Sequence, residues 1–514
     1  MSDEARDSAD FIGSLLHPSS LSAQSSVALA TRADGAWDER TYAELDRQSA
    51  QVRTWLSQHG VNVGHRVGLL GDSGGDWAAG FLGILRHGGV VVPFDSTLTV
   101  DELDRLWTRT PLAALLVSRR HLGSIEELPA SLREHVSVLV LEDIAATRRE
   151  DGADTHRSLD DVAMIVWTAG TTGSAKGACL TFRNLEYVVS QSIVESGATA
   201  DDRWLSVLPL NHMLELSCGL LACLRTGATM AFPRSHMPNE IVDAMLERRV
   251  TRMMVVPVLL RLLYPTLVRN PEVRQRLRAL FSGGAPLSPE LLQRYRELGV
   301  PVFQGYGLTE FSPVVSMNSA KSNRPGSVGK PLPGTEVRIS HGEILVRSPG
   351  LMTGYLADPE STSRALDDDG WFHTGDLGEL DDDGYLYVTG RAKNLVVLES
   401  GKKVSPEEVE AELDRSELFV EVCVVPLPID PLANGGPESV CAVVVPTAEV
   451  RARVSDHALT EAVEAEVRRC SQSLSGYKRP TVVEIRHTPL PKTAKMSLRR
   501  AEVLASVRES RECR

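Results

Sequence analysis

Short apolar runs alternate with longer amphipathic stretches over most of the chain. Apolar runs at residues 66–70 and 89–93 follow a stretch at 42–59 in which hydrophobic residues recur with the spacing of a helix. A second strand–helix cycle passes through residues 113–117, and a third leads from residues 253–258 into a helix after them. This alternation indicates an α/β architecture.

The pattern changes near residue 334, where short strands are separated by Gly, Pro and Asp turns. It predicts a small β-rich subdomain that extends to about residue 388. Beyond it we expect a compact α+β domain with a charged helix at 405–415, apolar strands at 420–425 and 440–445, and a second helix at 459–474. Because the 514 residues exceed the roughly 250–300 that one core holds, two or more domains are expected.

The composition is that of a globular protein, since 42% of the residues are apolar and 24% are charged. A net charge of -13 argues against a nucleic-acid partner. The seven cysteines include no C-x-x-C pair, which favours a reduced chain and a cytoplasmic location. The first residues are acidic, and the longest apolar region, 205–232, is interrupted by His212, Glu215 and Arg225. We therefore expect neither a secretory signal nor a transmembrane segment.

Residues 168–177 read TAGTTGSAKG and directly follow the apolar run AMIVW. Gly170 and Gly173 allow successive backbone N–H groups to point at one anion. Further donors to a phosphate group are the hydroxyls of Thr168, Thr171, Thr172 and Ser174 and the ammonium of Lys176. The run does not fit the P-loop pattern, because Gly177 follows the lysine and the glycine spacing differs. A Gly- and Ser-rich turn would explain the run alone, but the motifs downstream favour a polyphosphate site for ATP.

Two downstream segments offer the parts of a nucleoside site. Residues 281–288, FSGGAPLS, place small residues at a strand end, where a flat base could lie against the backbone of Gly283, Gly284, Ala285 and Pro286. Residues 304–310, QGYGLTE, offer the aromatic face of Tyr306, the hydroxyl of Thr309 and the carboxylate of Glu310, which could hold Mg²⁺. Taken alone, the second segment is equally well explained as a turn.

Asp376 and Arg391 offer two more polar groups. Asp376 follows a glycine turn in HTGD, where its carboxylate is suited to accept hydrogen bonds from ribose hydroxyls. On its own, such an aspartate is more often a turn residue or a helix cap. Arg391 begins RAKN and could reach a nucleotide across the domain boundary, although an exposed ion pair is the ordinary alternative.

In this order the phosphate run, GGAPLS, QGYGLTE, GWFHTGD, GRAKN and GKKVSPEEVE resemble the motifs of the adenylate-forming superfamily. Its members are acyl-CoA synthetases, aryl-CoA ligases, luciferases and peptide-synthetase adenylation domains, and the resemblance covers most of the chain. It implies a large N-terminal domain, residues 1–392, made of two α/β subdomains and a small β-rich subdomain. It also implies a small mobile α+β domain, residues 393–514, that rotates about a hinge at Lys393.

The resemblance further implies two half-reactions at one site. A carboxylate attacks the α-phosphate of Mg-ATP and expels pyrophosphate, and the thiol of coenzyme A then attacks the acyl-adenylate and releases AMP. Thr309 would touch the α-phosphate, and Glu310 would bind Mg²⁺. The residues predicted to bind ATP or AMP are Thr168, Gly170, Thr171, Thr172, Gly173, Lys176, Gly283, Gly284, Ala285, Pro286, Gln304, Gly305, Tyr306, Gly307, Thr309, Asp376 and Arg391.

The superfamily's catalytic lysine lies near the C-terminus, in a segment of the type PKTxxGKIxR. Here residues 490–500 read LPKTAKMSLRR, with one residue fewer before the lysine and Ala494 where the glycine would stand. Lys495 is the predicted catalytic lysine, and Lys492 is the second choice. The alternative is that both are solvated tail lysines and that adenylation is impaired.

Residues 208–216, LPLNHMLEL, bear on the class of acid. They lack the Asp that pairs with the ammonium group in amino-acid adenylation domains, and they resemble the His-Met-x-Glu-Leu pattern of fatty acyl-CoA synthetases. By this resemblance His212 lies beside the reacting carboxylate as a catalytic residue. The residues predicted to line an apolar acyl tunnel are Met213, Leu216, Cys218 and Val256, with Met254 and Val255 beside them.

The leading hypothesis is an ATP-dependent fatty acid–CoA ligase of medium to long chain preference, with ATP, Mg²⁺ and coenzyme A as its small molecules. A fatty acyl-AMP ligase that loads an acyl carrier protein is one alternative, but no insertion is visible between residues 334 and 390. A ligase of aryl or other carboxylic acids is a second alternative. A non-catalytic nucleotide or acyl sensor is a third.

Overall fold

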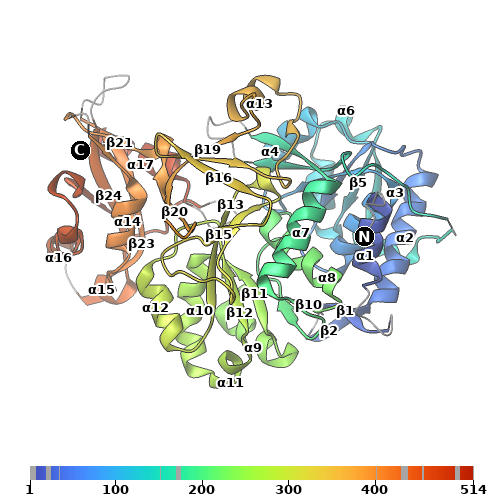
Figure 1. Ribbon diagram of the computed structural model, residues 1–514, viewed down its shortest axis with the longest axis horizontal. Coiled ribbons are helices and arrows are strands. Elements are labelled where there is room, and N and C mark those ends of the chain that lie inside the picture. The colour runs from blue at the N-terminus through green and yellow to red at the C-terminus, as the bar shows by residue number, and fades with distance from the viewer. Residues whose placement is uncertain are drawn as a thin grey trace.

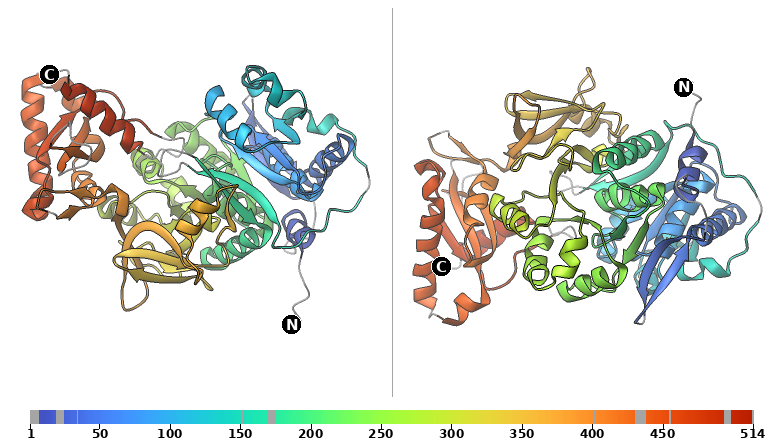
Figure 2. Two further views of the ribbon diagram at one scale, coloured as in Figure 1. Left: turned by 90° about the horizontal axis from the view of Figure 1, so that it is seen from above. Right: turned by 60° about the horizontal axis from the view of Figure 1, so that its bottom comes forward.

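The computed structural model describes residues 7–18, 25–33, 35–150, 152–168, 175–400, 402–429, 438–453, 456–492 and 498–512. They form a large α/β body followed by a smaller α+β domain (Figure 1). In both views of Figure 2 the smaller domain lies at the end of the molecule opposite to the first helices. The expected division into a large N-terminal and a small C-terminal domain is therefore present.

A seven-stranded sheet forms the N-terminal half of the body. Its order is β18 (Gly354–Tyr355), β8 (Lys176–Thr181), β7 (Val162–Thr168), β4 (Val90–Phe94), β3 (Arg66–Leu70), β5 (Ala114–Val117) and β6 (Ser137–Val140). The strands from β7 to β6 are parallel, whereas β8 and β18 run antiparallel to their neighbours. The apolar runs predicted at 66–70, 89–93 and 113–117 are confirmed as β3, β4 and β5.

A nine-stranded sheet forms the other half. Its order is β15 (Lys330–Pro331), β14 (Val314–Met317), β13 (Val302–Gly307), β12 (Ala279–Ser282), β11 (Arg252–Val255), β9 (Arg203–Leu205), β10 (Thr229–Phe232), β1 (Val27–Ala33) and β2 (Ala36–Thr41). The strand predicted at 253–258 is right only in its first part. It ends at Val255 because Pro257 begins helix α10 (Pro257–Arg269), where the N–H that proline lacks is not needed.

The β-rich subdomain predicted after residue 334 is an antiparallel sheet. It contains β16 (Glu336–Ser340), β17 (Glu343–Arg347), β19 (Phe372–Leu380) and β20 (Leu386–Arg391). A short helix that the sequence pattern did not predict, α13 (Pro359–Ala365), precedes β19. It begins where the carboxylate of Asp358 accepts a hydrogen bond from the N–H of Ser361.

One hydrophobic core joins the two large sheets. The helices that contribute to it are α1 (Ser8–Leu16), α2 (Tyr42–Gln58), α3 (Gly75–His87), α7 (Phe182–Ser196) and α8 (Ala222–Thr226). The predicted helix at 42–59 is confirmed as α2, which begins with a reciprocal capping pair between Thr41 and Glu44. The body also contains α4 (Val100–Arg109), α5 (Leu122–Glu126), α6 (Ala130–Arg133), α9 (Pro238–Arg248), α11 (Pro271–Arg276) and α12 (Pro289–Glu297).

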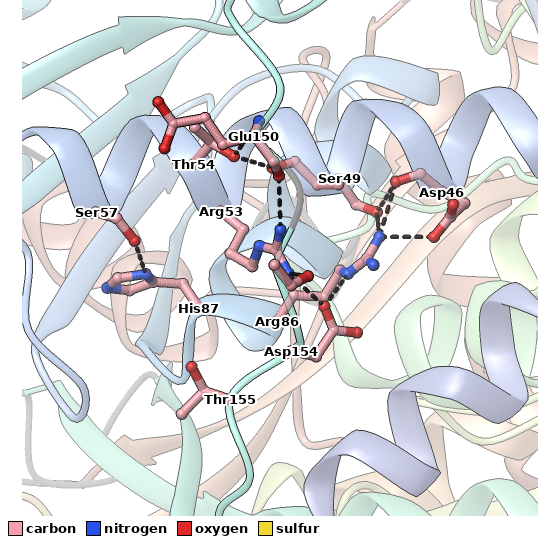
Figure 3. Close-up of polar contacts among 12 residues, drawn as sticks. Asp46, Ser49, Arg53, Thr54, Ser57, Arg86, His87, Glu150, Asp154 and Thr155 are labelled. Carbon is pink, nitrogen blue, oxygen red and sulfur yellow. Dashed lines mark hydrogen bonds and ion pairs between the residues drawn. The ribbon is translucent and has the colours of Figure 1, made fainter.

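A buried polar cluster fastens the connection between β6 and β7 to helices α2 and α3 (Figure 3). Arg86 of α3 donates from Nε to Asp154 over 2.7 Å and from Nη1 to Asp46 over 2.8 Å. Arg53 of α2 contacts the same Asp154 over 3.3 Å and also bonds to the carbonyl group of Gly152. Because β7 leads into the phosphate run, this cluster positions the strand on which that run begins.

The smaller domain has hydrophobic clusters of its own, formed by residues from Val396 onward. Its strands are β21 (Val396–Val397), β22 (Lys403–Val404), β23 (Phe419–Pro428), β24 (Glu438–Pro446) and β25 (Val482–Ile485). Its helices are α14 (Pro406–Leu413), α15 (Ala448–Arg453), α16 (Asp456–Cys470) and α17 (Arg500–Glu512). The predicted helices and strands correspond to α14, β23, β24 and α16, although α16 begins and ends earlier than expected.

Ion pairs join the smaller domain to α10 and α12 of the body. Arg261 lies 3.0 Å from Asp414, Arg294 lies 2.8 Å from Glu417, and Arg415 lies 2.7 Å from Glu290. All of the partners in the smaller domain belong to residues 414–417, directly after α14. No helix in the described part of the chain has both the length and the apolar character that crossing a membrane requires.

Candidate active site

The described ends of the phosphate run lie side by side on the β7–β8 hairpin. Thr168 ends β7 and is the register partner of Lys176 at the start of β8. The hydroxyl of Thr168 donates a hydrogen bond of 3.2 Å to the carbonyl group of Lys176. The strand predicted before the run is thus present. The other residues predicted here, Gly170, Thr171, Thr172 and Gly173, lie outside the described residues.

Arg109, the last residue of α4, contacts the chain at both ends of this run. Its guanidinium lies 4.7 Å from the ring centre of Trp167, and its Nη1 donates to the carbonyl group of Ala175 over 2.5 Å. An arginine over an aromatic face is an attractive contact. Arg109 was not among the predicted site residues, because no local pattern shows which distant cation will lie beside the hairpin.

Glu310 lies in the short helix η4 (Thr309–Phe311), close after β13. Its Oε1 accepts a hydrogen bond of 2.9 Å from the hydroxyl of Tyr355, and the Nζ of Lys176 lies 4.9 Å from the centre of the same tyrosine ring. Burial, and then the negative charge of Glu310, raise the pKa of the Tyr355 hydroxyl. Tyr355 is a second residue of the site that the sequence analysis missed.

The donor set at Glu310 fits a magnesium ion that is bound together with a polyphosphate. Mg²⁺ in nucleotide sites is usually held by one or two carboxylates and by phosphate oxygens, and it keeps several waters. Among the described residues there is no group of three or more His, Cys, Asp or Glu side chains that could hold a metal ion without such a ligand. Glu310 is therefore a candidate ligand for a metal that the nucleotide brings with it.

Asp376 connects the second nucleoside segment, through Tyr306, to Arg391. Its Oδ2 accepts a hydrogen bond of 2.7 Å from the hydroxyl of Tyr306, and its Oδ1 lies 2.8 Å from the Nε of Arg391. Asp376 is 2% exposed, and burial raises its pKa although Arg391 and Tyr306 lower it. It lies within β19 rather than in a free turn, but the strand is irregular here because Gly375 has a φ of 70°.

Each of the two nucleoside segments contains a glycine that the backbone requires. A Cβ atom at Gly307 would lie 1.8 Å from the carbonyl oxygen of Pro313, and Gly284 has a left-handed φ of 79°. Gly283 follows β12 directly, and α12 begins with Ser288 as its cap and Pro289 as its first residue. Ala285 and Pro286 lie in the loop between them, and Gln304 and Gly305 lie in β13.

The side predicted to hold the acid begins at the same glycines. Leu214 Cδ2 lies 3.3 Å from the position that a Cβ atom at Gly283 would occupy, and Val256 Cγ1 lies 3.9 Å from that of Gly284. His212 is half-buried just before the π-helix η3 (Leu214–Leu221). The loop before it is fixed by the N–H of Leu210, which donates to the hydroxyl of Ser73 over 2.9 Å. The structure therefore places Val256, together with Leu214, next to the nucleoside segment.

Other residues predicted for the acyl side lie deeper in the core. Met213, Leu216 and Cys218 are buried within the large core, and the Sγ of Cys218 lies 3.3 Å from the hydroxyl of Ser192 on α7. Glu215 is fully buried in η3, and burial raises its pKa to about 8. A π-helix is rare and often marks a functional site, and no local sequence pattern predicted this one.

The catalytic lysine predicted first, Lys495, lies outside the described residues. The second choice, Lys492, forms an ion pair of 2.5 Å with Glu421 of β23, and both side chains are largely buried. Lys492 also forms an isolated bridge with Leu498. The second choice is therefore already engaged within the smaller domain.

Arg499 follows on the C-terminal side of this segment. A hydrogen bond to Glu502 raises the pKa of its guanidinium, and the negative charge of Glu102 on α4 adds to the same direction. Arg499 thus lies near α4, the helix that also carries Arg109.

Lys393, the predicted hinge, lies in the short helix η5 (Ala392–Asn394) after β20. Burial, and then the nearby charge of Arg391, lower the pKa of its ammonium group to about 8. The rotation about Lys393 and the domain boundary beside it stay predictions.

Comparisons with known proteins show the family to which the chain belongs. The family model described as AMP-binding enzyme matches residues 22–356, and that of the AMP-binding enzyme C-terminal domain matches residues 393–510. A feruloyl-CoA synthase from Amycolatopsis sp is 33% identical over 402 residues, which cover 75% of this chain and 80% of the relative. A 2-succinylbenzoate--CoA ligase from Bacillus pumilus is 32% identical over 394 residues, covering 73% and 77%.

The structural comparison covers nearly the whole chain. The ATP-bound crystal structure of MatB from Rhodopseudomonas palustris is 28% identical, covers 98% of this chain and 99% of its own, and has a TM-score of 0.86. The apo structure of the same protein gives 0.75 over the same coverage. The chain thus resembles the ATP-bound structure more closely than the apo structure. It belongs to the AMP-binding enzyme family of the adenylate-forming superfamily, and it is an AMP-forming acid–thiol ligase.

Proposed function

We propose that this ligase activates a hydrophobic monocarboxylic acid, with an aryl-substituted acid such as a cinnamic acid as its first substrate class. The observation that carries the proposal is the apolar wall formed by Leu214 and Val256, which adjoins the glycines of the nucleoside segment. An acid whose carboxylate meets ATP here would have its hydrocarbon part against these two side chains. Burial of apolar surface then supplies the binding free energy.

The charge of the surrounding sequence supports a single carboxylate. Residues 204–224, 253–260 and 281–288, which supply this side of the site, contain no Lys or Arg. These three stretches offer no Lys or Arg to pair with a second carboxylate on the substrate, and burial of an unpaired carboxylate is costly. The proposal therefore favours a neutral acyl group over a dicarboxylic acid.

The relatives support an acid with an aromatic ring, and the local motif supports a fatty acid. The names of the relatives, feruloyl-CoA synthase and 2-succinylbenzoate--CoA ligase, refer to acids with an aromatic ring. The His-Met-x-Glu-Leu pattern of residues 212–216 supports fatty acids of medium to long chain as the second candidate. Coenzyme A as the thiol is supported by both relatives, and a carrier protein as acceptor stays an alternative.

The site residues divide the work of the two half-reactions. Lys176 and Thr168 hold the phosphates that leave as pyrophosphate, and Lys495 neutralises charge as the carboxylate attacks the α-phosphate. Asp376 and Arg391 orient the nucleoside. Mg²⁺, which Glu310 would hold, would neutralise charge on the phosphate oxygens when it is bound. His212 lies on the acid side and orients the attacking carboxylate before CoA displaces AMP.

The test is acyl-CoA formation with ATP and coenzyme A over a panel of acids that differ in one property at a time. Cinnamate, 4-coumarate and ferulate vary the ring, octanoate and palmitate vary chain length, and 2-succinylbenzoate adds a second carboxylate. We expect kcat/KM for the best cinnamic acid to exceed that for 2-succinylbenzoate by at least about tenfold. Higher values for octanoate or palmitate than for every aryl acid would move the assignment to the fatty acid class.

A matched pair of variants tests the wall itself. Leu214→Lys places a cation beside Gly283 and should lower kcat/KM for cinnamate relative to 2-succinylbenzoate by about tenfold. Leu262→Lys adds the same group on the exposed side of α10, where Leu262 is 49% exposed, and should leave the ratio unchanged. Equal ratios in both variants would exclude Leu214 from the acyl site.

A further inference from the structure

Lys176 and Glu310 carry opposite charges and bind different ligands in the same site. In the proposed function the lysine binds phosphate and the carboxylate binds the magnesium ion that accompanies the phosphate. Before ATP arrives, two such groups attract each other, and a direct ion pair would occupy both. In the structure both charges instead contact Tyr355, the lysine through the ring face and the carboxylate through the hydroxyl.

The backbone around Tyr355 is fixed to the elements that carry both charges. Strand β18 pairs antiparallel with β8, with Tyr355 opposite Ala178, and the N–H of Leu356 donates to Gly177 over 2.7 Å. On the other side the N–H of Met352 donates to the backbone carbonyl group of Glu310 over 2.7 Å. The N–H of Tyr355 itself donates to the hydroxyl of Thr362 over 2.9 Å. The tyrosine is therefore held at a set position between β8 and η4.

The two contacts use different parts of one side chain. The negative face of the ring attracts the ammonium group of Lys176, whose Nζ lies 4.9 Å from the ring centre. The hydroxyl donates to one oxygen of Glu310 over 2.9 Å and leaves the second oxygen of that carboxylate without a role in this contact. A phenylalanine would preserve the first contact alone, and an aliphatic residue would preserve neither.

We propose that Tyr355 is a positioning residue that keeps Lys176 and Glu310 apart, so that each is ready for its own ligand, the phosphate and the metal ion. This inference rests on the proposed function for the roles of Lys176 and Glu310, but it adds a residue to which no role has been assigned. It predicts that the ring and the hydroxyl of Tyr355 act on different properties of ATP binding.

The test measures the dissociation constant of ATP by calorimetry, without any acid or CoA, once in EDTA and once over a series of Mg²⁺ concentrations. Tyr355→Phe should leave the affinity in EDTA within about twofold of the wild type, because the ring face is kept. It should raise the Mg²⁺ concentration needed for half of the magnesium effect by about fivefold, because Glu310 loses its hydrogen bond. An unchanged Mg²⁺ dependence would overturn the role of the hydroxyl.

Tyr355→Leu should weaken ATP binding in EDTA by about tenfold, because Lys176 loses the ring and pairs with Glu310. Adding Glu310→Gln to the Tyr355→Leu variant should then recover more affinity than the same change gains in the wild type. The ratio of ATP affinities with and without Glu310→Gln is compared between the two backgrounds. A general loss of stability caused by Tyr355→Leu cancels from this comparison. Equal gains in the two backgrounds would overturn the separation of Lys176 from Glu310.

A matched control is Tyr187→Phe, which removes a hydroxyl on α7 that is bonded to Pro333 and Thr335 and should change neither measurement. Because the assay uses ATP alone, its result does not depend on which acid the enzyme accepts. Failure of the wild type to bind ATP would contradict the nucleotide site itself. Wild-type affinity and Mg²⁺ dependence in both Tyr355 variants would contradict only the role of Tyr355.

Discussion

The Nε of Arg391 lies 2.8 Å from Oδ1 of Asp376, and the two residues face each other across the β19–β20 pair. Asp376 is 2% exposed, so removal of the guanidinium leaves a buried carboxylate without its cation. We expect Arg391→Met to raise the KM for ATP by about tenfold or more, because the carboxylate then takes up a proton or moves. The KM is measured by pyrophosphate release at saturating acid.

The control for this change is Arg347→Met on the neighbouring β17. Arg347 pairs with Glu336 over 2.8 Å where both side chains are exposed, so its loss should alter the KM for ATP by less than about twofold. An equal effect of the two substitutions would remove the Arg391–Asp376 pair from the nucleotide site.

Glu215 should make stability depend on pH. Its pKa is raised by burial from 4.5 to about 8, so the folded protein keeps a proton that the unfolded chain releases above its ordinary pKa. The stabilising effect of this proton is fully present below the unfolded pKa and is lost as pH rises toward the folded value. As pH rises through this interval, the free energy of unfolding of Glu215→Gln should therefore increase relative to that of the wild type by at most about 1.4 kcal/mol per pH unit.

Denaturant unfolding of both proteins at pH 5.5, 6.5 and 7.5, followed by tryptophan fluorescence, checks this expectation. Glu240→Gln changes an exposed carboxylate in the first turn of α9 and should follow the wild type at every pH. Parallel curves for Glu215→Gln and the wild type would mean that Glu215 is ionised in the folded protein.

The two tail lysines should differ in the half-reaction that they affect. Lys495→Ala should lower the rate of adenylate formation by about a hundredfold or more and leave thioester formation from preformed acyl-adenylate largely intact. Lys492 is already paired with Glu421 over 2.5 Å, so Lys492→Ala should destabilise the smaller domain. It should lower the rate of adenylate formation less than Lys495→Ala does. Single-turnover measurements of each half-reaction decide between them, and the reverse order would make Lys492 the catalytic residue.

The cluster around Arg86 should contribute to the stability of the N-terminal half. Arg86→Met removes the cation that Asp46 and Asp154 share and leaves Asp154 only its longer contact with Arg53, and we expect a loss of about 3 kcal/mol in the free energy of unfolding. Arg148→Gln removes a guanidinium that is 77% exposed and should cost less than about 1 kcal/mol. Denaturant unfolding measures both, and equal losses would show that burial of the cluster contributes nothing.

Much of this architecture follows from short-range patterns. The capping pair of Thr41 and Glu44 marks the start of α2, Pro257 marks the change from β11 to α10, and Ser288 marks the start of α12. In each case the signal and the element that it controls lie within a few residues of each other. Each nucleotide motif is likewise a short contiguous run of residues, so the superfamily can be inferred from the sequence without the fold.

The residues that the sequence analysis missed depend on distant pairings. Tyr355 reaches Lys176 because β18 joins the edge of β8, and Arg109 reaches Ala175 because α4 ends beside the β7–β8 hairpin. No pattern near either residue encodes these neighbours. The acyl side shows the same limit, since Leu214 rather than Cys218 lies next to Gly283, and no local pattern indicates the π-helix that carries both residues.

The three ion pairs between the domains alternate in charge along the chain, and this alternation also bears on how the domains align. Residues 414, 415 and 417 carry negative, positive and negative charges, and they meet a positive, a negative and a positive group on α10 and α12. A displacement of this segment by one residue would bring charges of the same sign together. The charge pattern therefore favours one register of the segment against α10 and α12 over the adjacent registers. High salt should therefore reduce the free-energy difference between these registers and also weaken the contact between the two domains.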